Sequence, residues 1–266
     1  MQFESITYKD LNEIRKLQPE GWTDIIPDIE FYLKSPFCKS FKVLIDGNIV
    51  GMGTTIIFDN TAWIAHIIVG SDYRNQGIGF QLVNYLLEKL EKASIAACSL
   101  VATDFGKPVY LKAGYRIVGE YTFLQRKTTW KEYPASEKII PFKEEYRTMI
   151  YELDKKISGE NREQLLTGFL QHSLLYVDQN KVHGYYIPEL KEGLIFADTD
   201  EAGLELMKLK YSNVDNAVLP SGNIAGREFL LQNGFVETKK ATRMVLGKDI
   251  DWKPENVFSR IGGNLG

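Results

Sequence analysis

The sequence predicts an α/β protein made of two similar domains in tandem, each with a mixed, largely antiparallel sheet flanked by helices. Three observations predict this fold. The 266 residues exceed a typical single domain of roughly 100–200 residues. Strand-like and helix-like segments follow one another in both halves, as in sheets covered by helices. A segment of the first half also recurs in the second. We therefore expect domains at 1–128 and 136–266, separated by a polar stretch that closes with Pro134.

Hydrophobic patterns and turn residues predict the elements of the first half. Strands are expected at 2–8, 41–46, 48–58, 61–70, 95–103 and 115–125, and helices that begin at Asp10, Pro27, Gly77 and Lys107. Asp46-Gly47 between two β-rich runs indicates a hairpin. Asp10 and Glu13 have the spacing of a capping box. The helix from Gly77 carries one apolar face, formed by Leu82, Val83, Leu86, Leu87 and Leu90.

The second half repeats this order. Thr103–Tyr115 aligns without gaps with Asn223–Phe235, 120 positions further on. The matched pairs are Gly106 with Gly226, Leu111 with Leu231, Gly114 with Gly234, and Tyr115 with Phe235. Strands are expected at 137–141, 193–198, 214–220 and 235–246, a hairpin at 174–188, and helices at 143–157, 160–170, 199–210 and 224–232. The tail 252–266 is expected to be irregular. Together these features indicate a duplicated domain.

Composition and charge exclude several classes of protein. The net charge of −3 argues against a general nucleic-acid binder, which needs a basic surface. Cys38 and Cys98 cannot form a disulfide framework, and the three histidines lack zinc-ligand spacing, so no metal is expected. The N-terminus carries charges where a signal peptide is apolar. The longest charge-free apolar runs reach about half of a membrane span. We expect a cytoplasmic protein with no membrane or nucleic-acid partner; its oligomeric state stays open.

The loop after the strand at 61–70 carries the chemistry. Arg74, Gly77 and Gly79 lie between this buried strand and an amphipathic helix. Glycines let backbone N–H groups approach a ligand, and a helix N-terminus adds partial positive charge, so the loop suits a phosphate or pyrophosphate. A Rossmann fingerprint fails because Leu82 stands where its third glycine belongs. A Walker A loop fails because Gly79 is followed by Phe80.

The arrangement Arg74-Asn-Gln-Gly77-Ile-Gly79 resembles the acetyl-CoA loop of the GNAT acetyltransferase superfamily. The flanking Val69 and Tyr73 also fit that family. Downstream, the segment that starts at Tyr110 and ends in Gly114-Tyr115 is similar to the family's Tyr-x-x-x-Gly-Phe segment. The resemblance covers residues 2 to about 125 in element order. It implies acetyl-CoA as the co-substrate.

The resemblance also implies roles for particular residues. Backbone amides of 76–80 would cradle the pyrophosphate, and the strand edge at 67–69 would pair with the pantetheine arm. Tyr110 would be the catalytic residue, protonating the departing thiolate as general acid. Thr103 stands where the family often carries asparagine. The implied cofactor-binding residues are Ile67, Ile68, Val69, Arg74, Asn75, Gln76, Gly77, Ile78, Gly79, Phe80 and Thr103.

The general base is not evident. Many relatives place a glutamate where this chain has Trp63, and neither Trp63 nor Ala65 two residues on can accept a proton. The adjacent His66 can, because histidine titrates near neutral pH. Strand alternation turns it to the opposite face unless a β-bulge re-aims it, and a structural role is the favoured interpretation of His66. Asp104 and Asp59, which suit caps or turns, a water relay, or an amine that arrives neutral remain alternatives.

The second copy lacks the cofactor loop. Its strand at 195–198 runs directly into a helix whose start carries Asp198, Asp200 and Glu201. Carboxylates stabilise a helix N-terminus but repel a pyrophosphate. Leu230 replaces Tyr110, whereas Asn223 keeps the family's asparagine. The pattern resembles tandem GNAT proteins with an active N-terminal and a degenerate C-terminal domain. The second domain is therefore expected to bind no acetyl-CoA and to shape an acceptor pocket.

The resemblance implies an N-acetyltransferase that transfers acetyl directly to a primary amine of a small-molecule or peptide acceptor. Two alternatives stay open: a non-catalytic CoA-binding sensor or regulatory protein, and a transferase for another acyl group. Relatives often contact the acceptor through the helical segment after the first strand. Its aromatic residues here are Trp22, Phe31, Tyr32 and Phe37. Core packing explains most of these, and Trp22 is the one expected to be exposed.

Overall fold

The computed structural model describes residues 1–265, which form two compact units. The first unit comprises Met1–Arg116 together with Val245–Lys248. The second comprises Ile117–Met244 together with the residues from Asp249 on. The last strand of the first half thus belongs to the second unit, and four residues of the second half complete the first. The domain limits expected from the sequence follow chain order and stay a prediction.

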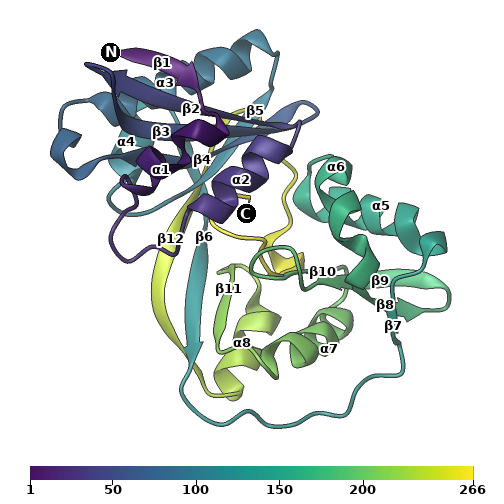
Figure 1. Cartoon of the computed structure of the whole chain (residues 1–266). Helices are drawn as coiled ribbons and strands as arrows, with labels where there is room; N and C mark the ends of the chain where they lie inside the picture. Colours follow the sequence, from purple (N-terminus) through teal and green to yellow (C-terminus); the bar gives the residue numbers. More distant parts are fainter. Residues whose placement is uncertain (266) are drawn as a thin grey trace. The chain divides into compact units, whose positions relative to one another are not determined.

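The first unit is built on a sheet with the strand order β1-β2-β3-β4-β5 (Figure 1). The strands are β1 (Gln2–Ser5), β2 (Cys38–Ile45), β3 (Asn48–Phe58), β4 (Thr61–Val69) and β5 (Ala97–Ala102). The helices are η1 (Tyr8–Asp10), α1 (Leu11–Arg15), α2 (Ile26–Lys34), η2 (Ser71–Tyr73), α3 (Ile78–Lys92) and α4 (Lys107–Lys112). Strands β1 to β4 pair antiparallel, whereas β4 and β5 run parallel. The mixed sheet expected from the sequence is confirmed.

Beside β5, the first unit is completed by the end of β12 (Phe235–Gly247). The Lys248 amide donates to the Ala96 carbonyl at 2.9 Å. Gly247 has φ +88, and a Cβ there would lie 2.3 Å from the Ala96 carbonyl oxygen. Only glycine therefore allows this close pairing of distant chain segments.

Local sequence explains the turns and helices of the first unit. Asp46 and Gly47 both have positive φ, 49° and 78°, as a two-residue hairpin turn requires. The expected capping box at Asp10 and Glu13 is wrong. A 3-10 turn starts the helical segment earlier, so the Asp10 carboxylate accepts from the amide and hydroxyl of Thr7 at 2.8 and 2.9 Å, and Glu13 pairs with Lys16. The apolar face of α3 is buried as expected, with Leu87 half-buried.

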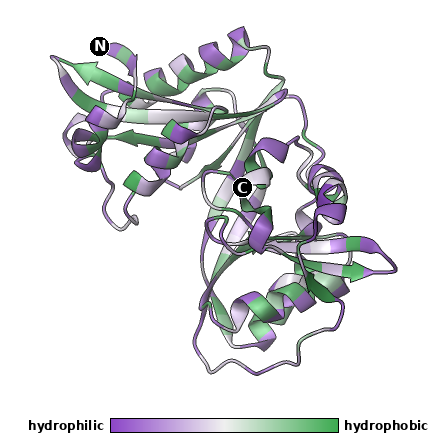
Figure 2. Cartoon of the chain, turned by 45° about the vertical axis from the view of Figure 1, so that its right-hand side comes forward, coloured by the Kyte–Doolittle hydropathy of each residue, from purple (hydrophilic) through white to green (hydrophobic). Residues whose placement is uncertain are grey.

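Two sets of helices cover this sheet. Figure 1 shows α1 and α2 in front of the strands and α3 behind them. Helix α3 packs on β3 and β4, and α2 packs on β2. Figure 2 shows apolar and polar colours on the same helices, as expected for helices with one face on a sheet.

The second unit holds β6 (Arg116–Arg126) from Ile117 on, together with the elements that follow it. Its strands are β7 (Ile139–Pro141), β8 (Leu174–Asp178), β9 (Lys181–Ile187), β10 (Leu194–Ala197), β11 (Asn216–Pro220), β12 up to Met244 and β13 (Val257–Ser259). Its helices are η3 (Glu144–Tyr146), α5 (Arg147–Ser158), α6 (Glu163–Leu166), η4 (Thr167–His172), α7 (Asp200–Tyr211), α8 (Ile224–Gln232) and η5 (Pro254–Asn256). One sheet has the order β13-β10-β9-β8-β7, and β12, β6 and β11 are neighbours in another.

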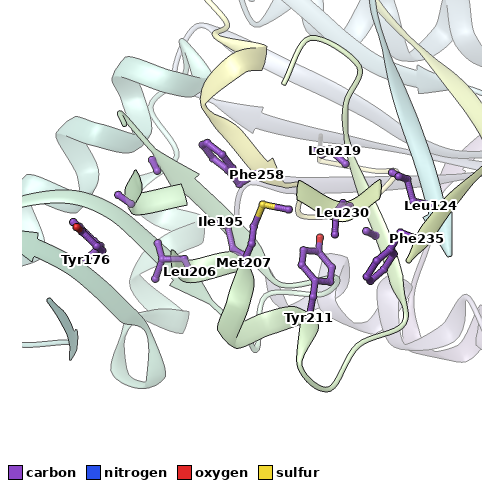
Figure 3. Close-up of a cluster of buried hydrophobic side chains, with 13 residues drawn as sticks. Leu124, Tyr176, Ile195, Leu206, Met207, Tyr211, Leu219, Leu230, Phe235 and Phe258 are labelled. Atoms are coloured by element: carbon purple, nitrogen blue, oxygen red, sulfur yellow. The ribbon is translucent and has the colours of Figure 1, made fainter. Parts of the chain in front are cut away.

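A core cluster of the second unit joins helices α7 and α8 to its strands. Figure 3 shows labelled side chains of this cluster: Leu124, Tyr176, Ile195, Leu206, Met207, Tyr211, Leu219, Leu230, Phe235 and Phe258. Phe258 belongs to the tail, which the sequence predicted to be irregular. That prediction is wrong for 257–259, because pairing with β10 makes this segment a strand. Burial of Phe258 in the core holds it there.

Candidate active site

A β-bulge interrupts β4 at His66. Thr54 of β3 pairs with Ala65 and Met52 with Ile68, so two residues of β4 face the single residue Gly53. His66 has φ +49, which is uncommon for a residue with a Cβ. A Cβ on Gly53 would meet the Ile67 side chain at 2.8 Å, so glycine opposite the bulge makes room for Ile67. The bulge that could re-aim His66 is therefore present.

The bulge brings the His66 ring to helix α2. Its Nδ1 lies 2.9 Å from the Tyr32 hydroxyl, and its Nε2 lies 3.3 Å from a carboxylate oxygen of Asp28. The His66 side chain is 8% exposed and that of Asp28 35% exposed. Trp22 presents its ring edge-on to His66, with centroids 6.1 Å apart, and is exposed as expected. Imidazole, phenol and carboxylate thus form one contiguous polar cluster that reaches solvent at Asp28.

Strands β4 and β5 separate beyond the start of their pairing. Their parallel register covers Thr61–Trp63 against Ala97–Ser99. The remainder of β4, including Ile67, Ile68 and Val69, lies beyond this paired segment. Backbone groups on that edge of β4 can therefore pair with an extended ligand.

The loop between β4 and α3 leaves the helix N-terminus uncapped. Asn75 and Gly77 have φ +60 and +78. Gly77 is the N-cap residue, it supplies no side-chain cap, and the first turn of α3 holds no acidic residue. Arg74 turns back, its Nε donating to the Val69 carbonyl at 3.1 Å, and Gln76 donates to the Asp72 carbonyl at 3.2 Å. The first amides of α3 are thus available to an anion.

Gly79 shows that this loop leaves room for a ligand. It lies in the first turn of α3, where the fold does not require glycine. A Cβ there would meet only Val69, at an ordinary 3.7 Å. Ile78 is buried beneath the loop, and Phe80 is half-buried with the Lys112 ammonium 4.5 Å from its ring. The residues present fit a CoA pyrophosphate, which needs close backbone approach at Gly79.

Tyr110 lies on α4, with Thr103 at the turn before that helix. Thr103 Oγ1 accepts from the Gly106 amide at 3.2 Å, so its side chain caps the turn. The Tyr110 ring packs edge-on against Tyr115, with centroids 5.9 Å apart. Burial raises the pKa of the Tyr110 phenol above its usual range, so the hydroxyl stays protonated at neutral pH. Within residues 1–265 that hydroxyl has no hydrogen-bond partner.

The other candidate residues are placed differently. Trp63 and Ala65 are buried in β4. Asp59 lies in the β3–β4 turn with φ +55, about 16 Å along β4 from His66, so the structure separates it from the bulge. Asp104 is exposed in the turn after β5. Among the described residues, no cluster of three or more His, Cys, Asp or Glu could hold a metal ion.

Sequence reasoning missed Asp28 as a site residue and gave Tyr32 only as an acceptor-side aromatic. Helical spacing was the available signal, because positions four apart share a helix face. That signal could pair Asp28 with Tyr32 but could not connect them to His66, 34 positions from Tyr32. The bulge alone creates that contact.

The equivalent region of the second unit is built differently. The Thr199 side chain accepts from the Ala202 amide and caps α7, whose first turn carries Asp200 and Glu201. Asp198 contacts His183 at 2.9 Å. A helix N-terminus capped by its own chain and flanked by carboxylates does not favour a pyrophosphate.

Comparison with known proteins assigns the family. A family model described as the acetyltransferase (GNAT) family matches residues 8–115, and one described as an acetyltransferase (GNAT) domain matches residues 150–259. The two matches together span most of the chain. The chain belongs to the GNAT acetyltransferase family, a family of N-acyltransferases.

Solved structures share the fold. A proposed acetyltransferase from Pyrococcus horikoshii aligns over 100% of this chain and 95% of its own, with TM-score 0.84 and 18% identity. A GCN5-related N-acetyltransferase from Sphaerobacter thermophilus aligns over 95% and 98%, with TM-score 0.64 and 14% identity. Another from Anabaena variabilis covers 92% of this chain and 72% of its own, with TM-score 0.57 and 14% identity. A search of curated proteins gives no match. No helix among residues 1–265 is long and apolar enough to cross a membrane.

Proposed function

We propose that this protein is an acetyl-CoA-dependent N-acetyltransferase that acts on a primary amine of a small-molecule or peptide acceptor. The observation that carries the proposal is the loop at 74–79. Gly77 has a left-handed backbone conformation and precedes a helix N-terminus that has no side-chain cap. Gly79, in the first turn of that helix, has no side chain to block a ligand. The same loop follows a strand edge that lies beyond its paired segment. Anion site and strand edge together suit the pyrophosphate and the pantetheine arm of CoA.

The roles of the chain's own groups follow from this placement. Backbone amides from Gln76 to Phe80 bind the pyrophosphate, and the edge at 67–69 pairs with the amides of the arm. Tyr110 keeps its proton at neutral pH because its pKa is raised, so it can donate that proton to the departing thiolate. Thr103 contributes to this end of the site only through the turn that it caps.

We infer that the acceptor's proton is taken by the pair of Asp28 and His66. The Asp28 carboxylate is the exposed member, so it receives the ammonium group and then the proton. The His66 ring steadies the second carboxylate oxygen from Nε2 while Nδ1 accepts from Tyr32. The pair thereby supplies the base that Trp63 cannot.

A cytoplasmic location, also expected from the sequence, stays a prediction.

The second unit is proposed to bind no acetyl-CoA. Its helix α7 is capped by Thr199, and the first turn carries Asp200 and Glu201, whose carboxylates repel a phosphate. This supports the expectation of one active and one degenerate domain.

Calorimetric titration with acetyl-CoA tests the proposal. We expect one tight site per chain, lost in Gly77→Glu. Gly47→Glu is the matched control, because Gly47 also has φ +78 and open space around its α-carbon, but lies in the β2–β3 turn. Wild-type protein that fails to bind, or equal binding by both variants, contradicts the proposal.

Thiol release from acetyl-CoA against an amine panel then separates enzyme from sensor. Amine-dependent release is expected, and binding without any release identifies a CoA-binding sensor. Faster release from a longer acyl-CoA identifies a different acyl group.

A further inference from the structure

The C-terminal tail of the second unit lies between two strands of that unit. β13 pairs antiparallel with β10, Ser259 against Ile195 and Val257 against Phe196. On its other side, the Arg260 amide donates to the Val218 carbonyl of β11 at 3.3 Å. The tail is therefore hydrogen-bonded to both β10 and β11.

We call the space between β10 and β11 the β10–β11 cleft. It corresponds to the space between β4 and β5 of the first unit, where the proposed cofactor binds. β10, α7 and β11 follow one another in the chain as β4, α3 and β5 do. The internal repeat fixes the correspondence, since β5 precedes Thr103 and β11 precedes the matching Asn223. In the first unit β4 and β5 separate. In the second, the edge of β10 that corresponds to the pantetheine edge is filled by the chain itself.

One aromatic side chain anchors the tail. Phe258 is fully buried, with its ring against Gly203 of α7 and Gly226 of α8. A Cβ on Gly203 would lie 2.3 Å from Phe258 Cε2, and one on Gly226 would lie 3.2 Å from Cδ1. Two helices thus carry glycine where the ring lies, so the pocket is shaped for a large flat side chain.

Polar side chains hold the tail backbone at successive positions. Asn223 donates to the Val257 carbonyl at 3.0 Å, and Asn256 donates to the Ala197 carbonyl at 2.8 Å. Lys210 donates to the Ser259 hydroxyl at 2.5 Å. Arg260 makes a bidentate ion pair with Glu192, at 2.7 and 2.8 Å. Asn223 occupies the position at which cofactor-binding relatives carry asparagine. In this chain its side-chain amide donates to the backbone of the tail.

We propose that the cleft between β10 and β11 is a peptide-binding site whose ligand is the chain's own C-terminal segment, residues 254–265, bound in place of a CoA arm. The segment binds by strand addition, and Phe258 in its glycine-lined pocket supplies the specificity. Two consequences follow. The second unit depends on the tail for its stability, and the chain holds one CoA rather than two. Only the second consequence rests on the proposed function.

A cleavable tail tests this binding in the full chain. A protease site is inserted after Asp249, which is exposed, and the folded protein is then cut. We expect the severed tail to co-elute with the rest of the chain. A labelled synthetic peptide of residues 250–265 should exchange into the complex, and a Phe258→Ala peptide should bind on the order of 100-fold more weakly. A tail that leaves without change in Tm, or equal binding of both peptides, overturns the proposal.

Coupling between Gly203 and Phe258 provides a second test that needs no cut. Gly203→Ala should lower Tm by several degrees in the wild-type chain, because its Cβ collides with the ring. In the Phe258→Ala background the same change should leave Tm equal or raise it, because alanine favours a helix. Equal effects in both backgrounds overturn the proposed pocket.

Titration of the intact chain with acetyl-CoA separates the two proposals. Two bound equivalents contradict the filled cleft. No bound equivalent contradicts the proposed transferase, while the peptide and coupling results still decide the role of the tail.

Discussion

The Asp28 carboxylate lies 3.3 Å from His66 Nε2, and the Tyr32 hydroxyl lies 2.9 Å from His66 Nδ1. The three residues come from one helix and one strand, and a bulge with φ +49 at His66 joins them. A regular β4 would break the contact, because a one-residue shift turns a side chain to the other face of a sheet. The polar cluster therefore depends on the bulge.

Asp28→Asn should lower kcat on the order of 100-fold while the KM for acetyl-CoA stays unchanged. Asparagine still accepts a hydrogen bond from His66, so the geometry is retained while the base is lost. Glu30→Gln is the control, because it removes the same charge from the same turn of α2, and residues two apart on a helix do not share a face. Equal rates for Asp28→Asn and wild type would show that another group takes the proton.

Gly79→Ala should separate fold from ligand binding. Alanine favours a helix over glycine by up to about 1 kcal/mol, and its Cβ meets only Val69 at 3.7 Å, so the free energy of unfolding should rise or stay level. The same methyl group would stand where the proposed pyrophosphate approaches, so the Kd for acetyl-CoA should rise about tenfold. Chemical denaturation and calorimetry measure the two effects. Unchanged affinity would remove the argument for close approach at Gly79.

Tyr110→Phe should lower kcat by about 100-fold or more without changing Tm by more than a degree or two. The hydroxyl has no hydrogen-bond partner among the described residues, so its loss removes no hydrogen bond of the fold. Steady-state rates with acetyl-CoA and thermal melts check both parts. Tyr115→Phe is the contrasting variant: its hydroxyl is buried against Cys98 at 3.1 Å, so the change should destabilise the fold. A Tyr110→Phe enzyme with wild-type kcat would exclude the general acid role.

Lys210 should make stability depend on pH. Burial lowers the pKa of its ammonium to about 8, whereas an unfolded lysine titrates near 10.4. Between pH 8 and 9.5 the unfolded chain therefore binds more protons, and the free energy of unfolding should rise with pH, by about 2 kcal/mol. Two pH units or more below 8, both states are protonated and this contribution is constant.

The Lys210→Met chain isolates this effect. The rise with pH should be smaller in Lys210→Met than in wild type, since other titrating groups cancel in the comparison. Lys208→Met, a change on the same helix at a partly exposed position, should keep the wild-type rise. Urea unfolding at pH 8.0 and 9.5 measures this rise in the free energy of unfolding for each chain. The same slope in wild type and Lys210→Met would show that Lys210 titrates normally.

Local chemistry made most of the first unit predictable. The Asp46-Gly47 turn, the apolar face of α3 and the glycines of the loop at 74–79 follow from preferences of single residues and their spacing. Helix starts were harder to predict. The capping box expected at Asp10 and Glu13 forms instead between Thr7 and Asp10, because a 3-10 helix precedes α1 and includes Asp10. Asp28 escaped notice because its partner lies on a distant strand.

The family, the repeated α/β fold and the glycine loop at 74–79 follow from the sequence alone, because each depends on residues that are close in the chain. Three further points required the tertiary structure. A bulge in β4 brings the His66 ring to Asp28. Residues 245–248 belong to the first unit. Part of the tail forms a strand in the second unit. Each of these depends on pairing between segments far apart in the chain, and such pairing is set by packing and backbone hydrogen bonds rather than by local preference.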